Sequence, residues 1–235
     1  FRLSEKNPSA LVDADLHRLQ FVYSNSVNSR KDDLYMEALT RLEHRHSELP
    51  YSSEVSFEIA RMHSQLSAKY NPEDTTTLKY KWEKQKALAI CDQVILKYPA
   101  AIASKKCENL KTSITEKSIS FDVENVVLPE ESFPIALRYA NLKKVWFRVG
   151  KINPETYEKL MSKYYGRDLV DHLLKEIELA HEYNFELIDD SDYNMHATEI
   201  SSEGLTPGFY VAFVSNNSTF DYKTGIVAYQ KFFAS

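Results

Sequence analysis

Histidines at close spacing are the first residues that could hold a metal ion. His44 and His46 stand two positions apart in the segment EHRH. On a helix, side chains with this spacing point to different faces, so the pair is poorly placed to share one ion. The sequence contains no HExxH motif, no paired CxxC motifs and no acidic loop spaced for calcium. We therefore interpret both histidines as surface or half-buried side chains and expect no metal and no other cofactor.

Acid–base or nucleophilic catalysis would need a different arrangement. His172 and Glu176 are four residues apart, and Asp168 lies one helical turn earlier. A solvated helix face explains this spacing better than a catalytic site does. The sequence has no G-x-S-x-G elbow, and neither cysteine has a histidine neighbour. We expect no catalytic residue and no enzyme activity.

The two cysteines, Cys91 and Cys107, offer a different kind of chemistry. Each lies on the apolar face of a predicted helix, about eight residues before and after a turn near Pro99, so the two positions are level in an antiparallel helix pair. A disulfide needs a Cα separation of about 5.5 Å, which nearby alanines would permit. Such a bond would indicate an oxidising compartment such as the periplasm. The alternative is two reduced thiols in an apolar core.

Helical spacing of apolar residues runs from Val12 to about Ile114. One example is the spacing of Val55, Ile59 and Met62. The stretch AICDQVILKYP, followed by small residues, resembles the junction of two tetratricopeptide repeats, with a generic helical bundle as the alternative. Helices joined by its Tyr-Pro turn must be antiparallel. The predicted helical segments are residues 13–26, 32–49, 52–70, 77–99 and 100–114.

From Ser118 the apolar spacing drops to two, which is typical of half-buried strands. Three such stretches within residues 118–152, separated by short turns, predict an antiparallel meander. Strands are predicted again on either side of Gly204, with Phe209, Val211 and Phe213 on one face, and at the end of the chain.

Between the two groups of strands, residues 154–183 have a helical pattern with Pro154 in the first turn. The sequence thus predicts an α+β multidomain chain. Residues 1–116 form antiparallel, tetratricopeptide-like helical hairpins. Residues 117–235 form an immunoglobulin-like antiparallel β-sandwich with a helical insertion at about 154–183.

Charge and composition exclude several classes of partner. There are 29 basic and 34 acidic residues, so no basic surface for nucleic acid or an anionic membrane is indicated. No run of 18 apolar residues exists, and we expect no transmembrane segment. The opening FRLSEKNPSA has neither Met nor the apolar core of a signal peptide, which indicates a processed product or a part of a longer protein.

Aromatic residues could form a sugar-binding platform. Tyr157, Tyr164, Tyr165 and Tyr183 cluster in the helical insertion, although core packing is the commoner use of such side chains. The sequons in NNST begin at Asn216, but turn chemistry alone explains them. We assign Asn216 no functional role.

Three stretches resemble the bacterial alpha-2-macroglobulin-like family. ISFDVENVVLPEESFPIALRYANLKKVWFRV and DDSDYNMHATEISSEGLTPGFYVAFVS are similar to the first macroglobulin-type sandwich of these proteins. ALAICDQVILKYPAAIASKKCENLKTSI is similar to the helical segment before it, both cysteines included. The resemblance covers about residues 86–150 and 185–235. The residues in matching order in the second stretch are Tyr193, His196, Thr198, Glu199, Leu205, Gly208 and Tyr210.

The resemblance implies a very large, extracytoplasmic, often membrane-anchored parent built from serial sandwiches, which traps or inhibits proteases. The C-G-E-Q thioester motif of many members is absent here, as is a bait region. We therefore expect a non-catalytic N-terminal structural and interaction segment, located in the periplasm or cell envelope. Its partners would be neighbouring domains of the full-length protein and the parent's target proteases, with no nucleic acid.

The alternative is a standalone extracytoplasmic lipoprotein that binds a glycan or a peptide. This hypothesis predicts a solvent-exposed row of aromatic side chains in a concave pocket.

Overall fold

The computed structural model describes residues 8–235, which form two compact units. The first comprises residues up to Thr115 together with Asp192–Asn194, and the second comprises Glu116–Ser191 and Met195–Ser235. The predicted boundary after residue 116 lies one residue beyond this division. Residues 1–7 lie outside the described part. They make up most of the opening stretch from which we predict that no signal peptide is present.

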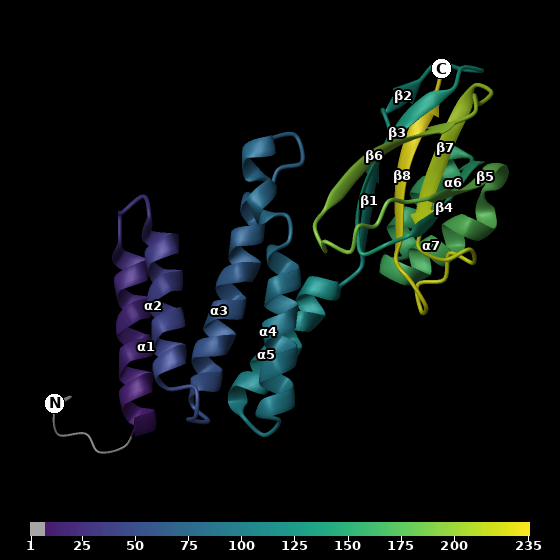
Figure 1. The fold of residues 1–235 in the computed structure, drawn as a ribbon. Helices are drawn as coiled ribbons and strands as arrows, with labels where there is room; N and C mark the ends of the chain where they lie inside the picture. Colours follow the sequence, from purple (N-terminus) through teal and green to yellow (C-terminus); the bar gives the residue numbers. More distant parts are fainter. Residues whose placement is uncertain (1–7) are drawn as a thin grey trace. The chain divides into compact units, whose positions relative to one another are not determined.

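The helical unit is a series of helices in which neighbours along the chain pack together (Figure 1). Helix forms in all five predicted segments, but the fourth begins later than predicted. Residues Thr75–Tyr80 form a separate 3-10 helix, whose start is capped by the Asp74 side chain, which accepts a hydrogen bond from the Thr76 N–H at 2.9 Å. The elements are α1 (Pro8–Asn25), α2 (Lys31–Arg45), α3 (Ser52–Leu66), η2 (Ser67–Lys69), η3 (Thr75–Tyr80), α4 (Glu83–Lys97) and α5 (Ile102–Thr115).

Small residues set the spacing of the last three helices. Ala60, Ala87 and Ala103 are completely buried, one on each of α3, α4 and α5. Side chains without further atoms beyond Cβ let the helix axes approach closely, as the sequence indicated for α4 and α5. The tetratricopeptide-like character of these hairpins stays a prediction.

The second unit contains two sheets, with strand orders β1-β3-β6 and β2-β8-β7-β4-β5. All pairings are antiparallel except that of β2 with β8, which is parallel. Their inner faces share one apolar core around Leu137, Phe147 and Tyr210. The strands are β1 (Ser118–Asp122), β2 (Val126–Val127), β3 (Phe133–Ala140), β4 (Lys144–Lys151), β5 (Glu178–Glu186), β6 (His196–Ser202), β7 (Gly208–Ser215) and β8 (Val227–Ala234).

The predicted meander is wrong in one respect. β1 pairs with β3 as a meander requires, but β3 and β4 belong to different sheets. Asn141 has a positive φ of 59°, and the next residue, Leu142, is buried in the core between the sheets. This turn therefore carries the chain from one sheet to the other and does not close a hairpin.

Helices α6 (Pro154–Lys163) and α7 (Gly166–Glu176) add a third layer on the outer face of the five-stranded sheet (Figure 1). The Asn153 side chain caps α6 by accepting a hydrogen bond from the Glu155 N–H at 2.8 Å, and Pro154 occupies the first turn as predicted. Because both faces of β7 are covered, its residues are buried almost without interruption.

The predicted end of the helical insertion at residue 183 is wrong. Helix α7 ends at Glu176, and residues 178–183 belong to β5. The physical reason is pairing: β5 forms an antiparallel ladder with β4 from Lys144↔Glu186 to Lys151↔Glu178.

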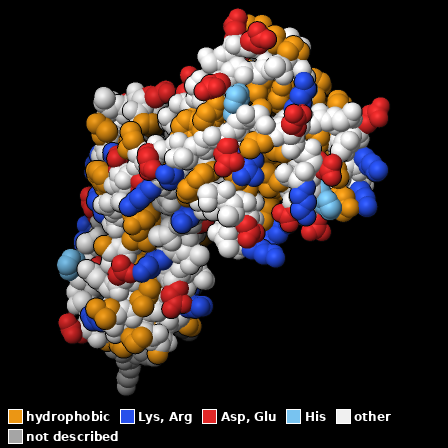
Figure 2. Space-filling model, turned by 90° about the vertical axis from the view of Figure 1, so that its right-hand side faces the viewer, with side chains coloured by type: hydrophobic (Ala, Val, Ile, Leu, Met, Phe, Trp, Pro, Cys, Tyr) orange, Lys and Arg blue, Asp and Glu red, His pale blue; other side chains and the backbone are white. Residues whose placement is uncertain are grey.

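On the face shown in Figure 2, acidic and basic side chains are interspersed. Among the described residues, no helix combines the length and apolarity needed to cross a bilayer.

Candidate binding groove of the helical unit

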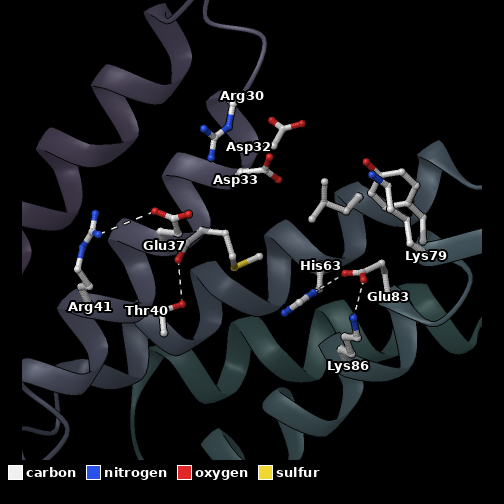
Figure 3. A pocket seen from close by; sticks show the side chains of 13 residues that line it. Arg30, Asp32, Asp33, Glu37, Thr40, Arg41, His63, Lys79, Glu83 and Lys86 are labelled. Carbon is white, nitrogen blue, oxygen red and sulfur yellow. Dashed lines mark hydrogen bonds and ion pairs between the residues drawn. The ribbon is translucent and has the colours of Figure 1, made fainter. Parts of the chain in front are cut away.

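A groove of about 830 Å³ lies on the helical unit (Figure 3). Side chains from α2 line one side, those from η3 and the start of α4 line the other, and α3 contributes His63 and Leu66. We call it the charged groove. Its lining residues are Arg30, Asp32, Asp33, Met36, Glu37, Thr40, Arg41, His63, Leu66, Lys79, Tyr80, Glu83 and Lys86.

The charges in this groove balance. Four Lys or Arg residues and four Asp or Glu residues line it. A phosphate or nucleic-acid site would need an excess of basic residues. Because both signs are present along a groove of this size, the surface fits a ligand that itself carries both signs, such as a polypeptide segment.

Glu83 anchors one side of the groove. It is 5% exposed, receives a hydrogen bond from Lys86 Nζ at 2.7 Å, and lies 2.5 Å from His63 Nδ1 through its other oxygen. Burial alone would raise the pKa of Glu83, but the hydrogen bonds with Lys86 and His63 hold it below its ordinary value. The carboxylate therefore stays ionised and fixes the orientation of both neighbouring side chains (Figure 3).

Asp32 is fixed in a similar way on the opposite side. Lys69 Nζ lies 2.5 Å from one oxygen, and the Tyr23 hydroxyl donates to the other at 2.9 Å. The hydrogen bond from Lys69 is the main reason that the pKa of Asp32 is lowered. Lys69 and Lys79 both lie over the Tyr80 ring, at 5.5 and 5.0 Å from its centroid. Cation–π contacts of this kind hold the tyrosine in place at the groove.

A buried polar network supports α2 against α3. The Tyr35 hydroxyl donates to Glu58 Oε1 at 2.7 Å, and Arg61 Nε donates to Glu58 Oε2 at 2.8 Å. Tyr35 also stacks on Tyr23, with ring centroids 4.3 Å apart. Burial raises the pKa of Tyr35, so its hydroxyl stays a hydrogen-bond donor. The network thereby fixes α2, the helix that supplies more of the lining residues than any other element.

Cys91 and Cys107 are both completely buried and are free thiols in this structure. They lie on α4 and α5 and pack in the same apolar cluster. The interaction with Cys107 and burial raise the pKa of Cys91, whereas the interaction with Cys91 lowers the pKa of Cys107. The predicted disulfide stays a prediction, and both cysteines belong to one cluster of buried residues.

Mild oxidation is expected to join Cys91 and Cys107 and to stabilise the protein by about 3 kcal/mol, the value for closing a loop of about 15 residues. Thiol titration in denaturant would count the free thiols before and after treatment with oxidised glutathione, and urea unfolding would measure the gain. Cys107→Ser is the control, because it should show no gain after oxidation. Two titratable thiols remaining in the oxidised wild type would refute the prediction.

The other residues considered from the sequence do not assemble into a site. His44 is exposed, and His46 lies at the C-cap of α2. The His172 ring stacks on Tyr164, with centroids 3.8 Å apart, while Asp168 and Glu176 are exposed. Among the described residues, no group of three or more His, Cys, Asp or Glu side chains could hold a metal ion.

The tyrosines named from the sequence do not form an exposed row. Tyr157 is 4% exposed in the core beneath α6, and Tyr183 is half-buried on β5. Tyr165 is 78% exposed, and Tyr164 is half-buried. Asn216 accepts a hydrogen bond from the Ile226 N–H at 2.7 Å, which agrees with a role in the turn.

Fold and groove together define an α+β protein that joins a helical unit to a β-sandwich covered by two helices. No protein-family model and no curated protein matches its sequence.

Several solved structures show partial likeness. A fragment of Escherichia coli alpha-2-macroglobulin spanning domains MG0-NIE-MG1 is 16% identical, with a TM-score of 0.32, over 51% of this chain and 39% of that one. The CARDB domain of a Pyrococcus furiosus protein is 8% identical, with a TM-score of 0.29, over 51% and 88%. The Pseudomonas fluorescens alkylpurine DNA glycosylase AlkC is 12% identical, with a TM-score of 0.29, over 96% and 63%. TM-scores of this size leave function undecided.

Proposed function

We propose that this chain is a non-catalytic N-terminal structural and interaction segment of a large alpha-2-macroglobulin-like protein, whose full-length form inhibits endopeptidases. The observation that carries the interaction role is the charged groove, which has equal numbers of acidic and basic residues and in which hydrogen bonds hold Glu83 and Asp32. The three resembling stretches, in the order that the family has, support the assignment to such a parent.

In this proposal the charged groove binds a polypeptide segment. Glu83 and Asp32 are each held by at least two side chains, so little conformational entropy is lost when a ligand contacts this part of the groove. The ligand is a segment of a neighbouring domain of the parent or of its target protease. The setting is extracytoplasmic, in the periplasm or cell envelope.

The alternative function is a standalone extracytoplasmic lipoprotein that binds a glycan or a peptide. Its glycan form needs exposed aromatic side chains in a row, and Tyr157 and Tyr183 are not available for one. The peptide form uses the same charged groove. The two proposals therefore differ chiefly in whether the reading frame continues into further sandwich domains.

A site-specific photo-crosslinker at Tyr80, introduced into the full-length protein, tests the groove. Irradiation followed by mass spectrometry is expected to give adducts to a peptide of the parent or of an added endopeptidase such as trypsin. The same crosslinker at Tyr165, an exposed tyrosine outside the helical unit, is the control. Equal yields of the same adducts at both positions, or none at Tyr80, would contradict binding in the groove.

The inhibitory role of the parent needs a separate measurement. The full-length protein is expected to slow the cleavage of casein by an endopeptidase, whereas the 235-residue chain alone is expected neither to slow it nor to hydrolyse substrates itself. A reading frame without further sandwich domains would favour the lipoprotein.

A further inference from the structure

The two sheets of the sandwich end unevenly on one side. One sheet has three strands and ends at β6, and the other has five and ends at β5. β6 pairs only with β3, and β5 pairs only with β4. Each of these strands therefore presents one edge whose N–H and C=O groups are outside the sheet ladder, which is a template for another extended segment.

A groove of about 490 Å³ lies between the two strand edges. Its lining includes five consecutive residues on each side, Asn184–Ile188 and His196–Ile200, together with Tyr139. Successive residues of a strand point to opposite faces, so a groove lined by consecutive residues borders the backbone edge itself. We call it the edge groove. At one end it is crossed by the Tyr139 hydroxyl, which donates to the Ile188 carbonyl at 2.8 Å.

The β5 side of the sandwich core is incompletely covered. His181, Tyr183 and Phe185 alternate along one face of β5 and are only half-buried. Their partners in the register on β4, Val149, Phe147 and Val145, are completely buried. The Tyr183 hydroxyl is buried, yet among the described residues it has no hydrogen-bond partner. One more strand beside β6 would widen the narrower sheet and extend its cover toward this row.

The acidic residues around β5 and β6 indicate which kind of polypeptide strand would pair there. Between Glu178 and Glu203 the sequence contains eight acidic residues and no Lys or Arg, although the whole chain has 29 basic residues against 34 acidic ones. Two of the eight are paired from β4: Glu182 with Arg148 at 2.9 Å and Glu186 with Lys144 at 2.9 Å. Glu199 on β6 and Glu203 just after it are exposed. An incoming segment along β6 thus meets the exposed carboxylates of Glu199 and Glu203.

We propose that the edge groove binds an extended, basic polypeptide segment, which pairs with β6 as a fourth strand of the three-stranded sheet. Main-chain hydrogen bonds to the free edge of β6 supply affinity. Alternate apolar side chains face the half-buried row on β5, and Lys or Arg side chains between them face Glu199 and Glu203. This site is separate from the charged groove of the helical unit and does not depend on the function proposed for that groove.

The probe is a seven-residue peptide, Lys-Val-Lys-Val-Lys-Val-Lys, with both ends blocked, added to the intact chain. Amide hydrogen exchange is expected to slow in β6 on binding. The substitution Glu199→Lys is expected to weaken binding about tenfold, because it places like charges opposite each other. The same peptide with its three central residues N-methylated is expected not to bind, since N-methylation removes the N–H groups on both edges of the strand.

Glu73→Lys, at an exposed position in the helical unit, is the matched charge control and is expected to leave binding unchanged. The proposal would be overturned by equal weakening in both variants, by undiminished binding of the N-methylated peptide, or by slowed exchange confined to β5.

Discussion

Replacing Glu58 with alanine is expected to lower the free energy of unfolding of the helical unit by about 3 kcal/mol. Glu58 is 3% exposed and accepts hydrogen bonds from Tyr35 and Arg61. Removing the carboxylate leaves a buried hydroxyl and a half-buried guanidinium without their acceptor, and unpaired buried donors are costly. Urea unfolding at pH 7, followed by circular dichroism, measures the loss.

Two further variants separate the charge from the contact. Glu58→Gln keeps the shape and one acceptor oxygen, so we expect a smaller loss of about 1–2 kcal/mol. Glu37→Ala removes an exposed partner of Arg41 on α2, at 3.9 Å, and we expect less than about 0.5 kcal/mol. If Glu58→Ala cost no more than Glu37→Ala, the network would not stabilise the packing of α2 on α3.

The effect of Glu58 should also depend on pH. Burial favours a raised pKa, but the hydrogen bonds from Arg61 and Tyr35 prevail, and the pKa of Glu58 is lowered in the folded protein. A carboxyl group of this kind stabilises the fold fully above its unfolded pKa of about 4.3, and the contribution is lost as the pH falls through the lower folded value. The stability difference between wild type and Glu58→Gln should therefore be constant near neutral pH and shrink in acid. A difference that grew in acid would contradict this sign.

Local periodicity was sufficient to predict most elements of the fold. The spacing of Val55, Ile59 and Met62 predicted α3, and all three residues are buried. The alternation of Phe133, Ile135 and Leu137 predicted β3, and these residues face the core between the sheets. Such patterns succeed because each element buries one face, which imposes its own period on the sequence.

The errors arose where tertiary pairing decides the structure. The alternation in β3 and β4 is the same whether the strands are neighbours in one sheet or face each other across two, so the sequence did not distinguish a meander from a crossover. For β5, the spacing of Leu179, Tyr183 and Leu187 suits a helix as well as a strand, and the ladder with β4 decides for the strand.

The charged groove could not be predicted from the sequence for a different reason. Its residues come from α2, α3, η3 and α4, and no short segment contains enough of them to form a motif. His63 and Glu83, for example, are twenty residues apart and meet only after α3 and α4 have packed. That Cys91 and Cys107 lie in one buried cluster could be predicted from the sequence, because one hairpin turn, at Pro99, sets their register.

Replacing Phe213 with alanine is expected to destabilise the β-sandwich by about 3–5 kcal/mol. Phe213 is completely buried in the core between the five-stranded sheet and helices α6 and α7, where its ring lies 6.2 Å from that of Tyr229. Truncation would leave a cavity that a sheet and two helices cannot close without losing other contacts. Chemical unfolding of the intact chain would measure the change.

Phe233→Ala is the matched control, since Phe233 is 47% exposed on β8 of the same sheet and contacts Phe209 at a centroid distance of 4.9 Å. Because about half of the Phe233 side chain stays in contact with water in the folded state, its burial contributes only about half of the free energy of a fully buried ring. We therefore expect a loss of about 1 kcal/mol. A large difference between the two variants would mean that α6 and α7 are an integral layer of the sandwich. Similar small losses would mean that these helices form only a loose cover, because Phe213 would then gain little from their presence.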